Sequence, residues 1–105
     1  MKSTKFFKHN QSLKRDLNKF HKIIKALDND QRLMILHELE EGELSISQLA
    51  EKIWISQPYC SMHIKKLVDV GLVKLERKGK ESIPKITAEL KVLIPDLNVL
   101  LLRVE

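Results

Sequence analysis

Two helix starts that lie close together, at Ser45 and Ser56, constrain the fold of this chain more than any other feature. Ser45 and Gln48 have the spacing of a capping box, and Pro58 is tolerated in a first helical turn, where its missing N–H would have no partner. A tight turn at residues 54–55 must separate the two helices. Two short helices joined in this way, the second opening with small polar side chains, predict a helix-turn-helix.

The residues after the second helix predict a two-stranded wing. Gly71 lies where a left-handed residue would end a helix, and residues 72–77 then alternate between apolar and polar side chains as a strand does. Residues 78–80, Lys-Gly-Lys, predict a basic hairpin tip, and residues 82–87 return as a second strand. Because Pro84 cannot donate a ladder hydrogen bond, the return strand is expected at a sheet edge.

A further helix is expected ahead of this unit. Asp28 and Gln31 have capping-box spacing, an apolar cluster follows them, and Gly42 ends the helix. A short extended stretch around Leu44 then leads to the helix-turn-helix. The expected fold is therefore mainly α with a small β-wing, in the order helix, helix, short strand, helix, helix, strand, strand, helix.

The first and last helices, residues 11–27 and 88–104, each carry an apolar seam at three- and four-residue spacing, the last with an expected kink at Pro95. Leucine lies on more than one side of the last helix, which exceeds the single buried face that a small domain needs. We therefore expect these two helices to form a homodimer. The residues predicted at its interface are Leu13, Leu17, Phe20, Leu93, Leu97, Leu100 and Leu101.

Length and composition favour one small domain over residues 1–105, with residues 1–10 as a basic N-terminal tail. No apolar run approaches the roughly 20 residues that span a bilayer, and no secretory signal is evident, so a cytoplasmic location is expected. Cys60 is the only cysteine, which excludes an intramolecular disulfide framework and a zinc site with several cysteines.

The distribution of charge favours a polyanionic partner. The net charge is +5, and residues 1–25 hold eight Lys or Arg against one acid, whereas residues 26–51 hold one Arg against seven acids. Residues 65–85 are again basic, with seven Lys or Arg against three acids. Segregation of this kind predicts basic faces suited to nucleic acid and an acidic face turned elsewhere.

Four segments resemble the ArsR/SmtB family of bacterial winged-helix repressors. They are ALDNDQRLMIL (26–36), GELSISQLA (42–50), SQPYCSMHIKKL (56–67) and GLV (71–73). The resemblance implies a dimer built from the first and last helices, with the second helix of the helix-turn-helix in the major groove of an operator and the wing against the backbone. It also implies release of the DNA by an inducer, which is often a metal ion.

The known metal sites of that family are missing from the sequence. Metal-sensing members carry two cysteines in the motif that here is ELSISQL (43–49), and their other common site needs a histidine in the last helix, whereas no histidine follows His63. The remaining histidines, His9, His21 and His37, are isolated. We therefore expect no metal and no cofactor, and the inducer stays open. Cys60 occupies an inward-facing aliphatic position of the family and is expected to be a buried small hydrophobe.

The helix that starts at Ser56 and the basic wing contain the residues expected to bind DNA. The helix that starts at Ser56 offers free N–H groups to a phosphate, and the side chains of its first two turns reach base edges. The resemblance implies that Gln57 and Ser61 contact bases and that His63 lies near the backbone. Glutamine pairs with adenine and Met62 can contact a thymine methyl, which favours an A·T-rich operator. The predicted DNA-binding residues are Ser56, Gln57, Tyr59, Ser61, Met62, His63 and Lys65, with Arg77, Lys78 and Lys80 in the wing.

The sequence thus predicts a homodimeric transcriptional regulator that binds a double-stranded operator. One alternative is a winged helix that serves as a protein-interaction module and uses the acidic stretch 38–43 and Trp54. An enzyme is not expected, because the chain has no useful carboxylate pair, Gly-rich phosphate loop or Cys/His couple, and no catalytic residues are predicted.

Overall fold

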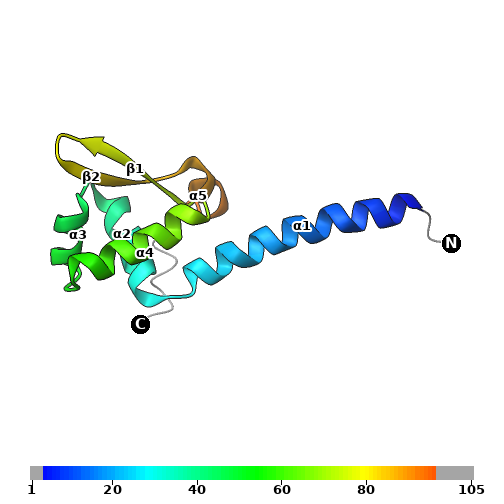
Figure 1. The fold of residues 1–105 in the computed structure, drawn as a ribbon, viewed down its shortest axis with the longest axis horizontal. Coiled ribbons are helices and arrows are strands. Elements are labelled where there is room, and N and C mark those ends of the chain that lie inside the picture. The colour runs from blue at the N-terminus through cyan, green and yellow to red at the C-terminus, as the bar shows by residue number, and fades with distance from the viewer. Residues whose placement is uncertain (1–3, 97–105) are drawn as a thin grey trace.

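The computed structural model describes residues 4–96, with side chains from residue 13 onward, and it has the predicted winged helix-turn-helix architecture (Figure 1). A long first helix extends away from a small body that contains the remaining elements. In chain order the elements are α1 (Thr4–Leu27), α2 (Asp30–Glu41), α3 (Ile46–Lys52), α4 (Gln57–Asp69), β1 (Val73–Lys78), β2 (Glu81–Ile86) and α5 (Ala88–Leu93).

One cluster of buried apolar side chains joins the elements of the body. Leu36 of α2, Leu49 of α3, Leu67 of α4 and Leu90 of α5 are all 0% exposed. Burial of a leucine of this kind stabilises the fold by about 1.5 to 3 kcal/mol. Ala26 joins the same cluster, and Ile23 and Leu27 pack against it, so the C-terminal end of α1 is anchored in the body.

Local side-chain hydrogen bonds begin the short helices where the sequence predicted. Ser45 and Gln48 form a complete capping box at α3, and the Ser56 hydroxyl accepts a hydrogen bond from the Tyr59 N–H at the start of α4. The predicted cap of α2 is wrong by one residue. Asn29, not Asp28, has the extended backbone of an N-cap, and its side chain accepts from the Arg32 N–H at 3.0 Å. Gly42 ends α2 as expected.

The wing is a two-stranded antiparallel hairpin whose strands start and end one residue from the predicted positions. Gly79 has φ 61, and glycine with positive φ at the first central position is typical of a tight two-residue hairpin turn. Pro84 pairs with Leu75 in a sheet that has only edge strands. The stretch around Leu44, expected as a short strand, is not one, and the described residues contain only the two strands of the wing.

Both terminal helices differ from the prediction. α1 begins at Thr4, so residues 4–10, expected as a tail, are helical. α5 ends at Leu93, whereas a helix to residue 104 with a kink at Pro95 was expected. Ile94 has φ −134 and ψ 88, the extended backbone favoured before proline, and Pro95 therefore ends the helix instead of bending it. The predicted interface residues Leu97, Leu100 and Leu101 lie outside the described residues.

Gly71 joins α4 to the wing. Its φ of 82 is in the left-handed region, as the sequence predicted, and its carbonyl accepts a hydrogen bond from the Thr87 hydroxyl at 2.7 Å. This bond holds the start of β1 against the end of β2, and so it fixes where the wing leaves α4. No helix in residues 4–96 is both long and apolar enough to cross a bilayer.

Candidate nucleic-acid interface

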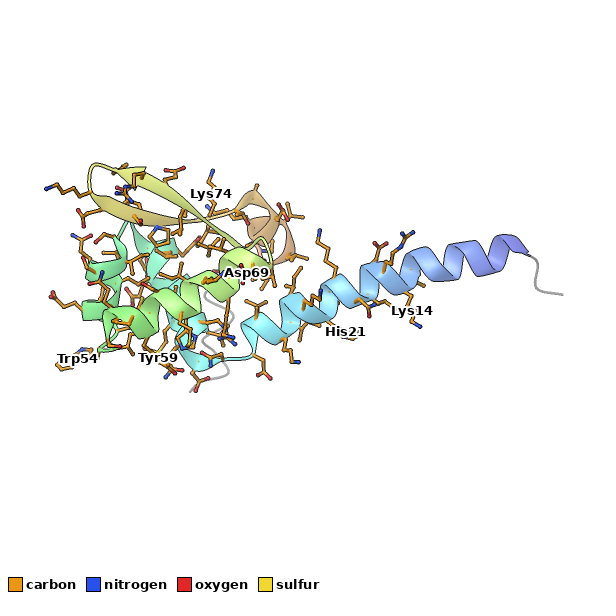
Figure 2. The ribbon with its side chains drawn as sticks, viewed as in Figure 1. Lys14, His21, Trp54, Tyr59, Asp69 and Lys74 are labelled. Atoms are coloured by element: carbon orange, nitrogen blue, oxygen red, sulfur yellow. The ribbon has the colours of Figure 1, made fainter. Side chains whose placement is uncertain are left out.

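The first two turns of α4 present polar and apolar side chains to solvent at the end of the molecule opposite α1 (Figure 2). Gln57 is exposed, Ser61 is half-buried, and Tyr59 and Met62 are 41% and 42% exposed. Lys65 follows on the same helix and pairs with Asp69 at 3.4 Å. With Ser56 at the cap, six of the seven side chains predicted in this helix are accessible to a ligand.

A polar groove joins α4 to the wing. Its volume is ≈ 270 Å³, and its lining includes Gln57 and Ser61 of α4, Ser47 of α3, and Lys80 and Ser82 of the wing. The groove therefore brings together predicted base-contacting and backbone-contacting residues from distant parts of the sequence. Ser47 and Ser82 could not be predicted from the sequence, because only the folded chain places these hydroxyls beside α4.

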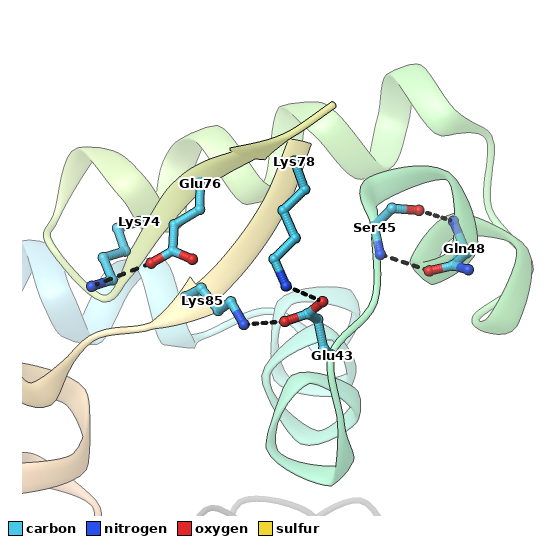
Figure 3. Close-up of polar contacts among 7 residues, drawn as sticks. All are labelled: Glu43, Ser45, Gln48, Lys74, Glu76, Lys78 and Lys85. Carbon is cyan, nitrogen blue, oxygen red and sulfur yellow. Dashed lines mark hydrogen bonds and ion pairs between the residues drawn. The ribbon is translucent and has the colours of Figure 1, made fainter. Parts of the chain in front are cut away.

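The basic residues of the wing are not equally free to bind an anion. Lys78 and Lys85 both form ion pairs with Glu43 in the segment before α3, the Lys78 pair at 2.8 Å (Figure 3). Hydrogen bonds from Lys78 and then Lys85 lower the pKa of Glu43 to about 2, and Glu43 in turn raises the pKa of Lys78. Arg77 is exposed and donates to the Gly79 carbonyl at 3.3 Å. Lys78 thus forms an ion pair between the wing and the segment before α3, a contact that the sequence did not predict.

His63, which the sequence predicted as a DNA-contact residue, is not exposed on this surface. It is 2% exposed, and its Nδ1 lies 3.0 Å from Nη1 of the buried Arg32. Arg32 also donates from Nε to the Ala26 carbonyl and from Nη2 to the Lys25 carbonyl at 3.5 Å. His63 is therefore part of a buried link between the end of α1 and α4.

The surroundings of His63 keep its ring neutral. Arg32 carries only donors, so His63 Nδ1 accepts the hydrogen bond and carries no proton. Burial first, and then the charges of Arg32 and Lys66, lower the pKa of His63 below its usual 6.5. The Tyr59 ring packs edge-on against the imidazole with centroids 4.4 Å apart, so the exposed tyrosine is positioned by the buried histidine.

Comparison with known proteins identifies the family. The model for "Bacterial regulatory protein, arsR family" matches residues 29–74. An arsenical resistance operon repressor of Staphylococcus aureus is 38% identical over 79 residues, which cover 74% of this chain and 76% of that protein. The chain belongs to the ArsR family. It is therefore a regulatory protein and not an enzyme, as the sequence predicted.

Solved structures agree with this assignment. Reduced HlyU from Vibrio cholerae is 26% identical with a TM-score of 0.72, covering 89% of this chain and 96% of that chain. A homodimeric winged helix-turn-helix domain from Mycobacterium bovis, Mb0332, is 25% identical with a TM-score of 0.72, covering 84% of this chain and 80% of that chain. The fold of this ArsR-family chain is thus that of winged helix-turn-helix DNA-binding domains.

Ser45 and Ser47, which the family resemblance matches to the cysteines of metal sensors, have structural contacts here. Ser45 is buried at the cap of α3, and its hydroxyl lies 3.2 Å from that of Ser47. His37, expected to be isolated, has its Nε2 3.9 Å from Oε1 of Glu41. No three metal-ligating side chains cluster in the part of the chain that the structure describes. Cys60 is 0% exposed, and burial raises the pKa of its thiol to about 11, which fits the expected small hydrophobe.

The predicted interface residues Leu13, Leu17 and Phe20 lie in one exposed row with Ile24, and these four side chains are called the apolar stripe of α1. Each is 45% or 46% exposed, and they recur at three- and four-residue spacing. Leu93 of α5 is also 45% exposed. Nearly half of the surface of each side chain in the apolar stripe is exposed, although the stripe lies on a helix whose C-terminal end packs in the core.

Proposed function

We propose that this ArsR-family chain is a homodimeric, sequence-specific DNA-binding repressor that works in the cytoplasm without the family's cysteine-based metal site. The observation that carries the proposal is the polar groove, because it joins Gln57 and Ser61 of α4 to Lys80 of the wing. A helix that reads bases beside a hairpin that holds phosphates is the arrangement of a winged helix-turn-helix on DNA. The staphylococcal relative is itself an operon repressor, which supports the direction of regulation.

A homodimer follows from the apolar stripe of α1. Four large apolar side chains exposed in one row favour burial against a second copy, since a C2 dimer lets the same stripe meet itself. The Mycobacterium bovis neighbour is described as homodimeric, which supports the same assembly. Two copies would present two α4 helices to two operator half-sites, and each half-site alone would have few contacts.

The experiment that tests this function compares base contacts with backbone contacts on one operator. Duplexes are first selected from genomic DNA with the purified protein, and variants are then titrated against the selected duplex and a scrambled one at several salt concentrations. Gln57→Ala should weaken the selected duplex by about 1 to 3 kcal/mol and the scrambled one little. Lys80→Gln should weaken both duplexes and reduce the salt slope by about one unit, because it removes one phosphate contact.

Glu81→Gln, also in the lining of the groove, is the matched control, since it removes an acid from the same surface and should not weaken either duplex. If Gln57→Ala weakened both duplexes equally, or if neither variant changed binding, the proposed roles of α4 and the wing would be wrong.

A further inference from the structure

Trp54 has the most exposed large apolar side chain among the described residues, and its backbone conformation is unfavourable. It is 92% exposed. Its φ is 63, and among the described residues no other non-glycine residue has a positive φ. A left-handed backbone is unfavourable for a bulky side chain, and exposure gains nothing for an apolar ring. Folding therefore does not account for tryptophan at this position, and such an outlier points to function.

The backbone around Trp54 is held firmly. Its N–H donates to the Glu51 carbonyl at 3.3 Å, and the Ile55 N–H donates to the Ala50 carbonyl at 3.1 Å. These two bonds form the Schellman motif that ends α3, with Trp54 at the left-handed position where glycine is usual. Ile53 is buried and Ile55 is half-buried on either side, which fixes the turn against the core. The indole is consequently held out in solvent.

The position of Trp54 relates it to the candidate nucleic-acid interface. The turn leads directly into Ser56 and Gln57 at the start of α4. In Figure 2, Trp54 lies beside the first turn of α4, at the same end of the molecule as the wing tip and on the other side of α4 from it. The major groove is about 12 Å wide, so a helix of similar diameter fills it and the residues beside the helix meet the walls of the groove.

We propose that Trp54 packs against the sugar-phosphate backbone of operator DNA, on the wall of the major groove opposite the wing. The indole face would cover a deoxyribose, and its N–H is a donor suited to a phosphate oxygen. Trp54 and Lys80 would then hold the two strands that border α4, one on each side. This inference rests on the proposed function, because it takes duplex DNA as the occupant of the surface.

The test uses the fact that Trp54 is the only tryptophan in the chain, so that intrinsic fluorescence reports on this side chain alone. Addition of the selected operator duplex should reduce acrylamide quenching of Trp54 at least about twofold, since DNA would cover the ring. Trp54→Gly should weaken binding of a fluorescein-labelled operator about tenfold, within the range for loss of a buried interface aromatic. Trp54→Phe should restore most of the affinity, because it keeps an aromatic face.

Two controls separate this contact from a folding effect. Trp54→Gly should raise the urea midpoint, because glycine is unstrained at positive φ, and weaker DNA binding by a more stable protein cannot result from unfolding. Met34→Ala removes an exposed apolar side chain from α2 and should leave operator affinity unchanged.

The outcomes also separate this inference from the proposed function. If labelled operator binds normally while quenching is unchanged and Trp54→Gly binds as tightly as the parent, the DNA contact is refuted and the regulator stands. Trp54 would then be free, in the DNA complex, to contact a protein partner. If no duplex is selected at all, both the proposed function and the Trp54 contact are wrong.

Discussion

Replacement of Arg32 by methionine should destabilise the fold by removing a buried polar link. Arg32 donates to the Ala26 and Lys25 carbonyls in the last turn of α1, where backbone carbonyls have no intrahelical partner, and it also donates to His63. Methionine keeps much of the apolar stem and volume but none of the donors. The Ala26 carbonyl and His63 Nδ1 would remain buried without partners, and His63 Nε2 already has none.

The size of the effect follows from the two closer bonds, to Ala26 and His63. A hydrogen bond to a charged group contributes about 1.5 to 3 kcal/mol, and loss of the cost of burying the guanidinium offsets part of the sum. We expect the free energy of unfolding to fall by about 2 to 3 kcal/mol. With a urea m-value of about 1.5 to 2 kcal/mol/M, the midpoint should fall by about 1 to 2 M.

Urea unfolding followed by circular dichroism measures this shift, and all variants are compared at the same protein concentration so that dimer dissociation contributes equally to each midpoint. Arg77→Met is the matched control, because Arg77 is exposed in the wing, and it should change the free energy by less than about 0.5 kcal/mol. A double-mutant cycle with His63→Leu should give a coupling energy of at least about 0.5 kcal/mol. An Arg32→Met variant as stable as the parent, or a coupling energy near zero, would refute the proposed link.

Four further outcomes are expected. His63 has a pKa in the folded state below its unfolded value of 6.5, so the unfolded chain takes up the proton first as the pH falls. The free energy of unfolding should therefore be highest above pH 6.5 and fall below it by up to about 1.4 kcal/mol per pH unit. Equal urea midpoints at about pH 7.5 and about pH 5.5 would contradict this. Glu43→Gln releases two wing lysines and should steepen the salt dependence of binding to scrambled DNA by up to about two units, whereas an unchanged slope would show that neither lysine reaches a phosphate. Leu17→Glu should shift the protein to monomer in sedimentation equilibrium, and the exposed Lys19→Glu, on the same helix, should not. Stoichiometric zinc, cadmium or arsenite should leave operator affinity unchanged, and release of DNA by any of them would reveal an additional site.

Elements specified by neighbouring residues could be predicted from the sequence. The capping box at Ser45, the cap at Ser56 and the left-handed Gly71 depend on contacts within a few residues, and the structure confirms all three. Local sequence does not decide which residue caps α2, because Asp28 and Asn29 are adjacent and both residue types can cap a helix. Only the backbone conformation of the folded chain selects Asn29.

Contacts between distant residues could not be predicted in the same way. Glu43 meets lysines 35 and 42 residues further along the chain, and nothing in its own neighbourhood distinguishes it from the other acids of that segment. The charge of its segment predicts an acidic face turned away from DNA, but it does not identify the partners of Glu43. Lys78 and Lys85 thus connect the wing to Glu43 by ion pairs. A count of basic residues alone would assign both lysines to nucleic-acid binding.

For His63, residue type and position in the helix point in different directions. Cys60, His63, Ile64 and Leu67 follow the three- and four-residue spacing of one helix face, and the structure buries all four. The period therefore placed His63 in the core, while its polar ring and the family resemblance favoured the surface. Trp54 is the opposite case, because it is an apolar residue that the structure leaves exposed at a helix end. Its left-handed φ becomes visible only in the folded backbone, and there the residue that local geometry favours is glycine. A buried polar group needs a partner inside the protein, and Arg32 is that partner for His63. An exposed apolar group with a strained backbone needs a partner outside it, and for Trp54 we expect this partner to be DNA.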